Sequence, residues 1–184
     1  MERPAETLPG PGFELQRWRP SDVALVHGAV NRSLSHLEPW VGWVGNGYSM
    51  ADGTEFITRA RETWDAGKTF DYKILVGGEL AGACGLMTRR GHGGLEIGYW
   101  LTPEHTGRGL MTRVAGVLVD EAFRVGATRV EIMHDEKNVR SGAIPRRLGF
   151  TEVERHEADE PGGWACNGIH VVWRLTNPGG PSAP

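Results

Sequence analysis

The hydrophobic positions along the chain follow two periods, and the change between them separates two parts of the fold. Residues 13–18 alternate like a short strand. Helices are predicted over about 21–34, with Ser21 as N-cap, and over 51–66, with Gly67 as the stop signal. From residue 70 the period shortens. Residues 70–76, 79–88 and 94–101 predict three strands of an antiparallel meander, with tight turns at 77–78 and 89–93.

Helical periodicity returns directly after the meander. One apolar face recurs at three- and four-residue spacing until Gly126 ends the helix, and its members are Met111, Val114, Leu118, Ala122 and Val125. Residues 128–134 then predict a strand. We expect it to run parallel to the strand at 94–101, because a crossover helix joins parallel neighbours. Asn138 is the predicted N-cap of a helix that runs to about residue 148, and residues 150–156 and 168–175 predict the final strands.

Together these elements predict an α+β fold. We expect a mixed, mostly antiparallel central sheet of about six or seven strands, flanked by about four helices. No repeat or linker interrupts the pattern, so a single domain is expected over residues 13–176. The ends at 1–12 and 177–184 are rich in Pro and Gly and are expected to be flexible.

The composition excludes several classes of function. The 184 residues carry a net charge of −3, which argues against nucleic-acid binding. The two cysteines, Cys84 and Cys166, are too few for a disulfide framework, and the histidines lack the spacing of metal ligands. The first residues lack the apolar core of a signal peptide, and no apolar run is long enough to span a bilayer. We therefore expect a cytoplasmic protein without a metal, a membrane or a nucleic acid as partner.

The segment TPEHTGRGLMT, residues 102–112, joins the third meander strand to the long helix. A Gly-rich helix start leaves backbone N–H groups unpaired at the positive end of the helix dipole, so it predicts a site for an anion such as phosphate. A P-loop is excluded because no Lys-Ser/Thr pair follows. A dinucleotide fingerprint is excluded because Thr112 takes the place of its third glycine, and because the loop follows an antiparallel meander.

A third interpretation accounts for more of the chain. The strand LEIGYWL, the loop EHTGRGLMT, the long helix and the downstream HDEKNVRSGAIPRRLGF together resemble the GNAT superfamily of acyl-CoA-dependent N-acyltransferases. The loop of that family is [QR]-x-x-G-x-[GA], and Gly109 and Arg108 agree with it. Thr106 replaces the usual Gln or Arg, and Met111 replaces the usual Gly or Ala. The methionine is familiar in the branch of ribosomal-protein N-terminal alanine and serine acetyltransferases. VNRSLSHLEPWVGWV and GWACNGIHVVWRL also resemble that branch, so the likeness covers residues 13–175.

The resemblance implies that acetyl-CoA or another acyl-CoA is the co-substrate. The loop would wrap the pyrophosphate, with N–H groups of residues 107–112 as donors and Arg108 as added positive charge. The acyl group would lie where the strand before the loop splays from the next strand. The residues expected to bind CoA are Trp100, Leu101, Thr102, Thr106, Gly107, Arg108, Gly109, Leu110, Met111, Thr112, Asn138 and Ser141.

The resemblance also implies catalytic roles. Glu96 is expected to act as the general base, directly or through water, although strand glutamates usually face solvent. A backbone N–H near Trp100 or Leu101 would stabilise the oxyanion. Ser141 would donate a hydrogen bond to the departing sulfur where other members use a tyrosine, and Asn138 would bind the pantetheine arm or orient Ser141. The alternative is that Asn138 only caps the helix and Ser141 only fills its first turn.

The acceptor pocket is expected in the irregular segment before the second helix. Trp40, Trp43 and Glu38 lie there, and aromatic side chains in a loop either line a pocket or form a core beneath it. The resemblance thus implies an acyl-CoA N-acyltransferase that transfers an acyl group, with acetyl as the first expectation, to a primary amine by direct attack in a ternary complex. The acceptor is a protein N-terminus or a small-molecule amine. A non-catalytic acyl-CoA sensor is the alternative, and the oligomeric state stays open, with a homodimer as one option.

Overall fold

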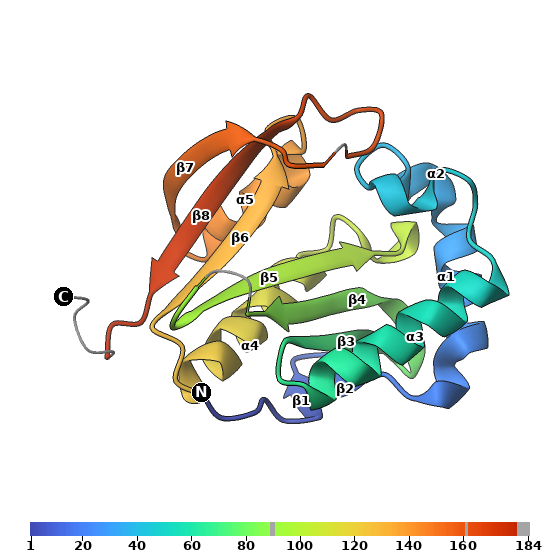
Figure 1. Cartoon of the computed structure of the whole chain (residues 1–184), viewed down its shortest axis with the longest axis horizontal. Coiled ribbons are helices and arrows are strands. Elements are labelled where there is room, and N and C mark those ends of the chain that lie inside the picture. Colours follow the sequence, from blue (N-terminus) through green and yellow to red (C-terminus); the bar gives the residue numbers. More distant parts are fainter. Residues whose placement is uncertain (89–90, 161, 180–184) are drawn as a thin grey trace.

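One twisted sheet forms the centre of the molecule, and helices cover both of its faces (Figure 1). The computed structural model describes residues 1–88, 91–160 and 162–179. The sheet has eight strands in the order β1-β2-β3-β4-β5-β6-β8-β7. Their bounds are Thr7–Gly10, Phe13–Arg17, Thr69–Val76, Glu79–Met87, Gly94–Leu101, Arg129–Asp135, Thr151–Glu157 and Ile169–Thr176 for β1 to β8.

Five α-helices and three short 3-10 helices are found in the described part of the chain. The α-helices α1 to α5 span Val23–Arg32, Leu34–Leu37, Met50–Asp65, Leu110–Arg124 and Val139–Arg147. The 3-10 helices span Pro20–Asp22, Gly42–Val44 and Pro103–His105. The predicted mixed α+β architecture is confirmed. The meander β3-β4-β5, the crossover helix α4 and the strand β6 follow one another as the periodicity predicted.

The sheet has one strand more than the upper end of the prediction. Residues 7–10, which we expected to be flexible, form β1 and pair with β2 from Thr7↔Gln16 to Gly10↔Phe13. The Pro and Gly content suggested a frayed end, but an edge strand tolerates Pro9, since one side of its backbone needs no partner. The N-terminal segment is also tied down by the Tyr72 hydroxyl, which donates to Ala5 O over 2.8 Å. The domain boundary at residue 13 stays a prediction.

The starts of α1 and α3 lie near, but not at, the residues that the sequence predicted. Ser21 is not the N-cap of α1, because it lies inside the 3-10 turn Pro20–Asp22 that precedes the helix. At α3, Ser49 accepts a hydrogen bond from Asp52 N, and the Asp52 side chain accepts from Ser49 N. This capping box satisfies donors that a helix start otherwise leaves open. Residues 89–90, which belong to the predicted turn at 89–93, lie outside the described residues. The same is true of residues 180–184 in the predicted flexible end at 177–184.

The core has two parts, one on each face of the sheet. One face packs against α4, whose predicted apolar stripe of Met111, Val114, Leu118, Ala122 and Val125 is buried against strand residues such as Leu95 and Ile97. The opposite face packs against α1 and α3, where Trp18, Val26 and Ile57 are buried. Burial of this stripe explains why α4 was predicted with nearly the right bounds, since packing of one apolar face supplies most of a helix's stability.

The strands β5 and β6 pair over only part of their length. They run parallel from Gly94↔Arg129 to Ile97↔Ile132, and beyond that point β5 stays with β4 while β6 stays with β8. Figure 1 shows the two strands diverging toward the end of β5. The expected splayed pair is therefore present. Those backbone N–H and C=O groups of residues 98–101 that point away from β4 therefore face a gap instead of a neighbouring strand.

Candidate active site

The start of α4 has the geometry of an anion site. Gly107 and Gly109 take φ angles of 73° and 70°, a left-handed conformation that favours glycine. Gly109 is the N-cap and has no side chain that could accept a hydrogen bond from the first turn. The first N–H groups of the helix are therefore left without a capping partner. The Thr106 hydroxyl donates to Pro103 O over 2.8 Å, which holds the preceding turn in place. The loop is thus shaped by backbone conformation rather than by capping side chains.

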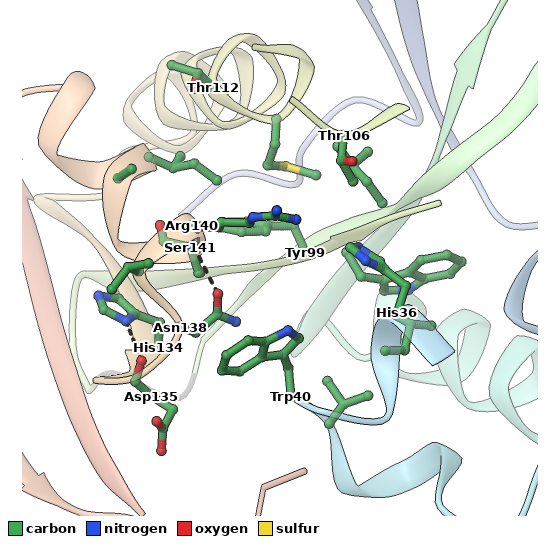
Figure 2. A pocket seen from close by; sticks show the side chains of 18 of the residues that line it. His36, Trp40, Tyr99, Thr106, Thr112, His134, Asp135, Asn138, Arg140 and Ser141 are labelled. Atoms are coloured by element: carbon green, nitrogen blue, oxygen red, sulfur yellow. Dashed lines mark hydrogen bonds between the residues drawn. The ribbon is translucent and has the colours of Figure 1, made fainter. Parts of the chain in front are cut away.

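A cavity of about 1020 Å³ extends from this loop into the gap between β5 and β6 (Figure 2). Its walls come from six parts of the chain: the end of α2 and the segment after it, the end of β5, the loop into α4 with the start of that helix, the end of β6, α5, and the loop before β8 with the start of that strand. Trp40 and His36 face it from one side, and Asn138, Ser141 and His134 from the other. The open helix start and the splayed strands therefore share one space.

The first turn of α5 presents a polar group to this space. The Asn138 side chain accepts a hydrogen bond from Ser141 N at 3.1 Å, which confirms it as the N-cap. The Ser141 hydroxyl lies 3.1 Å from the Tyr99 hydroxyl of β5. Burial raises the pKa of Tyr99 to about 12, although its hydrogen bond with Ser141 opposes the shift. Tyr99 therefore stays protonated at neutral pH and can support Ser141 as a hydrogen-bond donor.

His134 fixes α5 against β6. The Trp173 indole N–H donates to His134 Nε2 at 3.0 Å, so the ring proton is on Nδ1, which donates to Asp135 O at 2.7 Å. Burial lowers the pKa of His134, and Arg146 adds to this, so the ring is neutral near pH 7. Gly142 of α5 lies directly over the ring, because a Cβ there would come within 2.6 Å of Nε2. The helix that carries Ser141 is thus packed on a ring held from both sides.

Several arginines add positive charge to the cavity wall, and the sequence analysis did not single them out. Arg113 of α4 and Arg140 and Arg147 of α5 line the cavity into which the start of α4 opens. Burial lowers the pKa of His36, and the charge of Arg140 lowers it further, which places Arg140 near that imidazole. A cluster of guanidinium groups at a helix N-terminus fits a ligand with several phosphate oxygens.

The cavity brings together most of the residues expected to bind CoA. Those that line it are Trp100, Leu101, Thr106, Gly107, Gly109, Leu110, Met111, Thr112, Asn138 and Ser141, and Trp40, which was expected in the acceptor pocket, lines it as well. Thr102 is buried behind the wall, and its hydroxyl lies 2.9 Å from His105 Nδ1. Arg108 is not part of the lining in the described structure, although its carbonyl accepts from Arg113. The individual binding roles stay predictions.

The other candidates lie outside this lining. Glu96 is 3% exposed and lies on the side of β5 that faces away from α4, next to Glu131 of β6 in the pairing register. Trp43 is 50% exposed and packs edge-to-face on Tyr48, so it lies at the surface rather than in the cavity wall. The backbone of Glu38 packs close to Gly163 of the loop before β8. Their roles in catalysis and acceptor binding stay predictions.

Tyr99 is the clearest functional candidate that the sequence analysis missed. No pattern links Tyr99 with Ser141, because the strand and the helix that carry them are joined by a crossover. The remaining signal was the strand alternation, which places Tyr99 on the same side as Ile97 and the core under α4. Strand alternation alone therefore predicts that Tyr99 lies on the α4 side of the sheet. Its contact with Ser141 of α5 depends on tertiary packing.

Comparison with known proteins agrees with this geometry. The family model described as "Acetyltransferase (GNAT) domain" matches residues 13–151. YdaF of Bacillus subtilis (strain 168), whose name describes a ribosomal N-acetyltransferase, is 37% identical over 76 residues. That match covers 41% of this chain and only 39% of the relative. No described helix is long and apolar enough to cross a membrane.

Solved structures share the fold over nearly the whole chain. RimL, a ribosomal L7/L12 alpha-N-protein acetyltransferase in complex with coenzyme A, aligns with a TM-score of 0.86 and 21% identity, over 93% of this chain and 98% of its own. Mycobacterium smegmatis RimJ in complex with CoA-disulfide aligns with a TM-score of 0.82 and 22% identity, over 92% and 85%. The expected resemblance is confirmed, and the chain belongs to the GNAT acetyltransferase family.

Proposed function

We propose that the protein transfers an acetyl group from acetyl-CoA to a primary amine. The observation that carries this proposal is the single cavity that joins the uncapped start of α4, the gap between β5 and β6, and Ser141. The amides of residues 107–112 would bind the pyrophosphate, and Arg113, Arg140 and Arg147 would neutralise phosphate charge. The pantetheine arm would run past Asn138 and bring the thioester into the gap.

The strand edge supports an oxyanion site at Leu101. Thr102 N donates to Ala81 O of β4, and N–H groups alternate between the two edges of a strand. The N–H of Leu101 therefore points to the opposite edge, where β6 has turned away. A thioester carbonyl in the gap would accept a hydrogen bond from it as negative charge develops. This favours Leu101 over Trp100 among the two positions expected from the sequence.

The reaction would proceed by direct attack while both substrates are bound. The amine nitrogen attacks the thioester carbon, the C–N bond forms, and the C–S bond then breaks as the amine proton leaves. Ser141 would donate a hydrogen bond to the departing thiolate, and the Tyr99 hydroxyl would support Ser141. Since direct transfer needs no enzyme nucleophile, the buried Cys84 has no role in it.

A peptide N-terminus is the acceptor that the relatives favour. RimL and a Salmonella typhimurium acetyl transferase are described as acting on ribosomal protein L7/L12, the latter on its N-terminal serine. An α-amino group is also the easier nucleophile, because its pKa is about 8 whereas that of a lysine is about 10. We therefore propose an N-terminal acceptor, with Trp40 as part of its pocket.

A thiol-release assay tests this function. Acetyl-CoA and longer acyl-CoAs would be incubated with peptides that begin with Ser or Ala, with the same peptides blocked at the N-terminus, and with small amines. We expect thiol release with acetyl-CoA and the free peptides, and none above background with the blocked ones. Turnover restricted to small amines would overturn the peptide assignment. Acetyl-CoA binding without turnover of any acceptor would make the protein a sensor.

A further inference from the structure

The gap between β5 and β6 opens on two sides of the sheet, the side that α4 covers and the opposite side. Ile97 and Tyr99 of β5 point toward α4 and Ser141, so Glu96 points to the other side of the sheet. Residues that are partners in register share a face, and the register pairs Glu96 with Glu131, Asp135 with His170, and His170 with His156. We call this side, with Glu96, Asp135 and His170, the acceptor face. An amine that meets a thioester held from the α4 side would arrive here.

His170 stands at the junction between this face and the cavity. It lines the cavity together with Asp135 and Met133. The His156 ring of β7 packs edge-to-face on the His170 ring, with centroids 5.7 Å apart, and Asp135 of β6 is the partner of His170 in register. Asp159 of the loop that follows β7 and Glu96 of β5 act on His170 more weakly. The three carboxylates would stabilise a positive charge on the His170 ring, whereas His156 opposes it. An imidazole in such surroundings can accept a proton and hold it.

The other titratable groups of the cavity wall are less suited to take a proton. Both ring nitrogens of His134 are used by Trp173 and by Asp135 O. The Asp135 carboxylate accepts hydrogen bonds from the backbone N–H groups of Lys137, Asn167 and Gly168 at 2.9, 3.1 and 3.0 Å, so both of its oxygens are already used to hold the chain around it.

Two further histidines line the cavity at less favourable places. His105 Nδ1 lies 2.9 Å from the Thr102 hydroxyl, beside the start of α4. His36 lies next to Arg140, whose charge disfavours a second cation. Neither is part of the strands that form the acceptor face, since His105 follows β5 and His36 lies in α2. His170 is therefore the cavity-lining imidazole that the sheet contributes to this face.

We infer that His170 is the general base for the acceptor amine, and that Glu96 acts through it by stabilising the protonated ring. This inference rests on the proposed acetyl transfer. As the amine nitrogen bonds to the thioester carbon, its proton passes to a ring nitrogen of His170. The C–S electron pair leaves with sulfur, and the thiolate, which accepts a hydrogen bond from Ser141, takes its proton from water. His170 then returns its proton to solvent, which balances the cycle.

The protonation state of His170 agrees with this role. Burial lowers its pKa below 6.5, and His156 lowers it further, so the ring is neutral and able to accept a proton at pH 7. The rate then depends on two neutral groups, the ring and the amine. Below the His170 pKa, log kcat/KM should rise with a slope of about 2, and between that pKa and the amine pKa of about 8 with a slope of about 1.

The test is the pH profile of kcat/KM with acetyl-CoA and a peptide that begins with serine. His170→Gln should lower kcat/KM about 10²-fold at pH 7 and should show a slope of about 1 throughout, since only the amine then titrates. His156→Gln is the matched control on the neighbouring strand, and it should keep both slopes. Glu96→Gln should keep the bend but move it to lower pH, because it removes a carboxylate that raises the His170 pKa.

Four outcomes separate the possibilities. A His170→Gln profile that still bends, at a rate near that of the parent, would overturn the inference. A bend that is lost in Glu96→Gln but kept in His170→Gln would make Glu96 the base. In His170→Ala, added imidazole should restore turnover in proportion to its neutral fraction, and an absence of rescue would count against a base at this position. If the parent itself releases no thiol, the proposed function fails before this inference is reached.

Discussion

At the scale of single residues, the central contact is the hydrogen bond between Tyr99 and Ser141. Neither hydroxyl is a strong acid, so we expect their contribution to come from a hydrogen bond to the leaving thiolate rather than from full proton transfer. Ser141→Ala should lower kcat about 10²-fold at most, which is the low end for general acid catalysis. CoA affinity, measured by calorimetry, should stay close to that of the parent.

The same pair predicts strong coupling between two substitutions. Tyr99 would act through Ser141, so Tyr99→Phe should lower kcat in the parent but have little further effect in Ser141→Ala. A double-mutant cycle on kcat measures this directly. If the two losses simply add, Tyr99 does not act through Ser141, and the proposed pair is wrong.

At the scale of elements, the packing of α5 against His134 determines the position of Ser141. Gly142→Ala would place a Cβ 2.6 Å from His134 Nε2, and the ring cannot easily yield because both nitrogens are bonded. The helix must shift, so kcat should fall at least tenfold, since small displacements of catalytic groups are costly. Gly116→Ala in α4 is the control, because its Cβ would meet only Leu148 at 3.8 Å. Equal kcat values for the two variants would contradict this account.

The start of α4 carries the prediction for CoA binding. Gly109→Glu adds a side chain at a φ of +70° and a negative charge where phosphate is expected, so CoA affinity should fall more than tenfold. Gly126→Glu is matched in charge and in left-handed conformation, with a φ of +95°, but lies at the other end of α4. It should reduce stability and leave CoA affinity unchanged. Calorimetric titration of both variants with CoA checks the difference, and equal weakening would argue against a phosphate site at Gly109.

The elements show which parts of the fold the sequence could predict. The meander and α4 were predicted because their burial alternates with the strand and helix periods, as in the buried stripe from Met111 to Val125. The strand β1 was missed, because Pro9 and Gly10 give it the composition of a loop and only pairing with β2 orders it. The one-turn helix α2 was missed for a similar reason: four residues are too few to show a period.

At the scale of the whole molecule, three partly buried histidines predict how stability depends on pH. Burial lowers the pKa of His36, His134 and His170 below the value near 6.5 of an unfolded chain. Between the folded and unfolded pKa values the unfolded chain binds more protons, so the free energy of unfolding falls as the pH falls. This contribution is fully present above pH 6.5 and is lost as the pH drops through the folded pKa values.

Urea unfolding at a series of pH values measures this effect. We expect a lower free energy of unfolding at pH 5.5 than at pH 7.5, and a smaller difference in His134→Gln, where one of the three titrating groups is gone. A free energy of unfolding that is constant or rises toward pH 5.5 would show that these rings are not buried in the neutral form.

The sequence could predict only those parts of the site whose residues lie close together in the chain. The spacing of Gly107 and Gly109 before a helix marks an anion site by itself, and Asn138 and Ser141 share one helical turn. Tyr99, Arg140 and His170 come to the cavity from three separate elements, so only tertiary packing brings them together. The same holds for Glu96, whose burial away from the cavity lining in the described structure could not be inferred from its place in a strand.

The most direct test of the central claim measures both products of one reaction. Acetyl-CoA and a peptide with a free N-terminal serine would be mixed with the protein, and thiol release and peptide acetylation would be followed together. The account predicts one thiol released for each acetyl group found on the α-amino nitrogen, and much less of both products with Gly109→Glu at the same, subsaturating acetyl-CoA concentration. Acetyl-CoA that binds in the cavity without thiol release, with this peptide or any other amine, would contradict it.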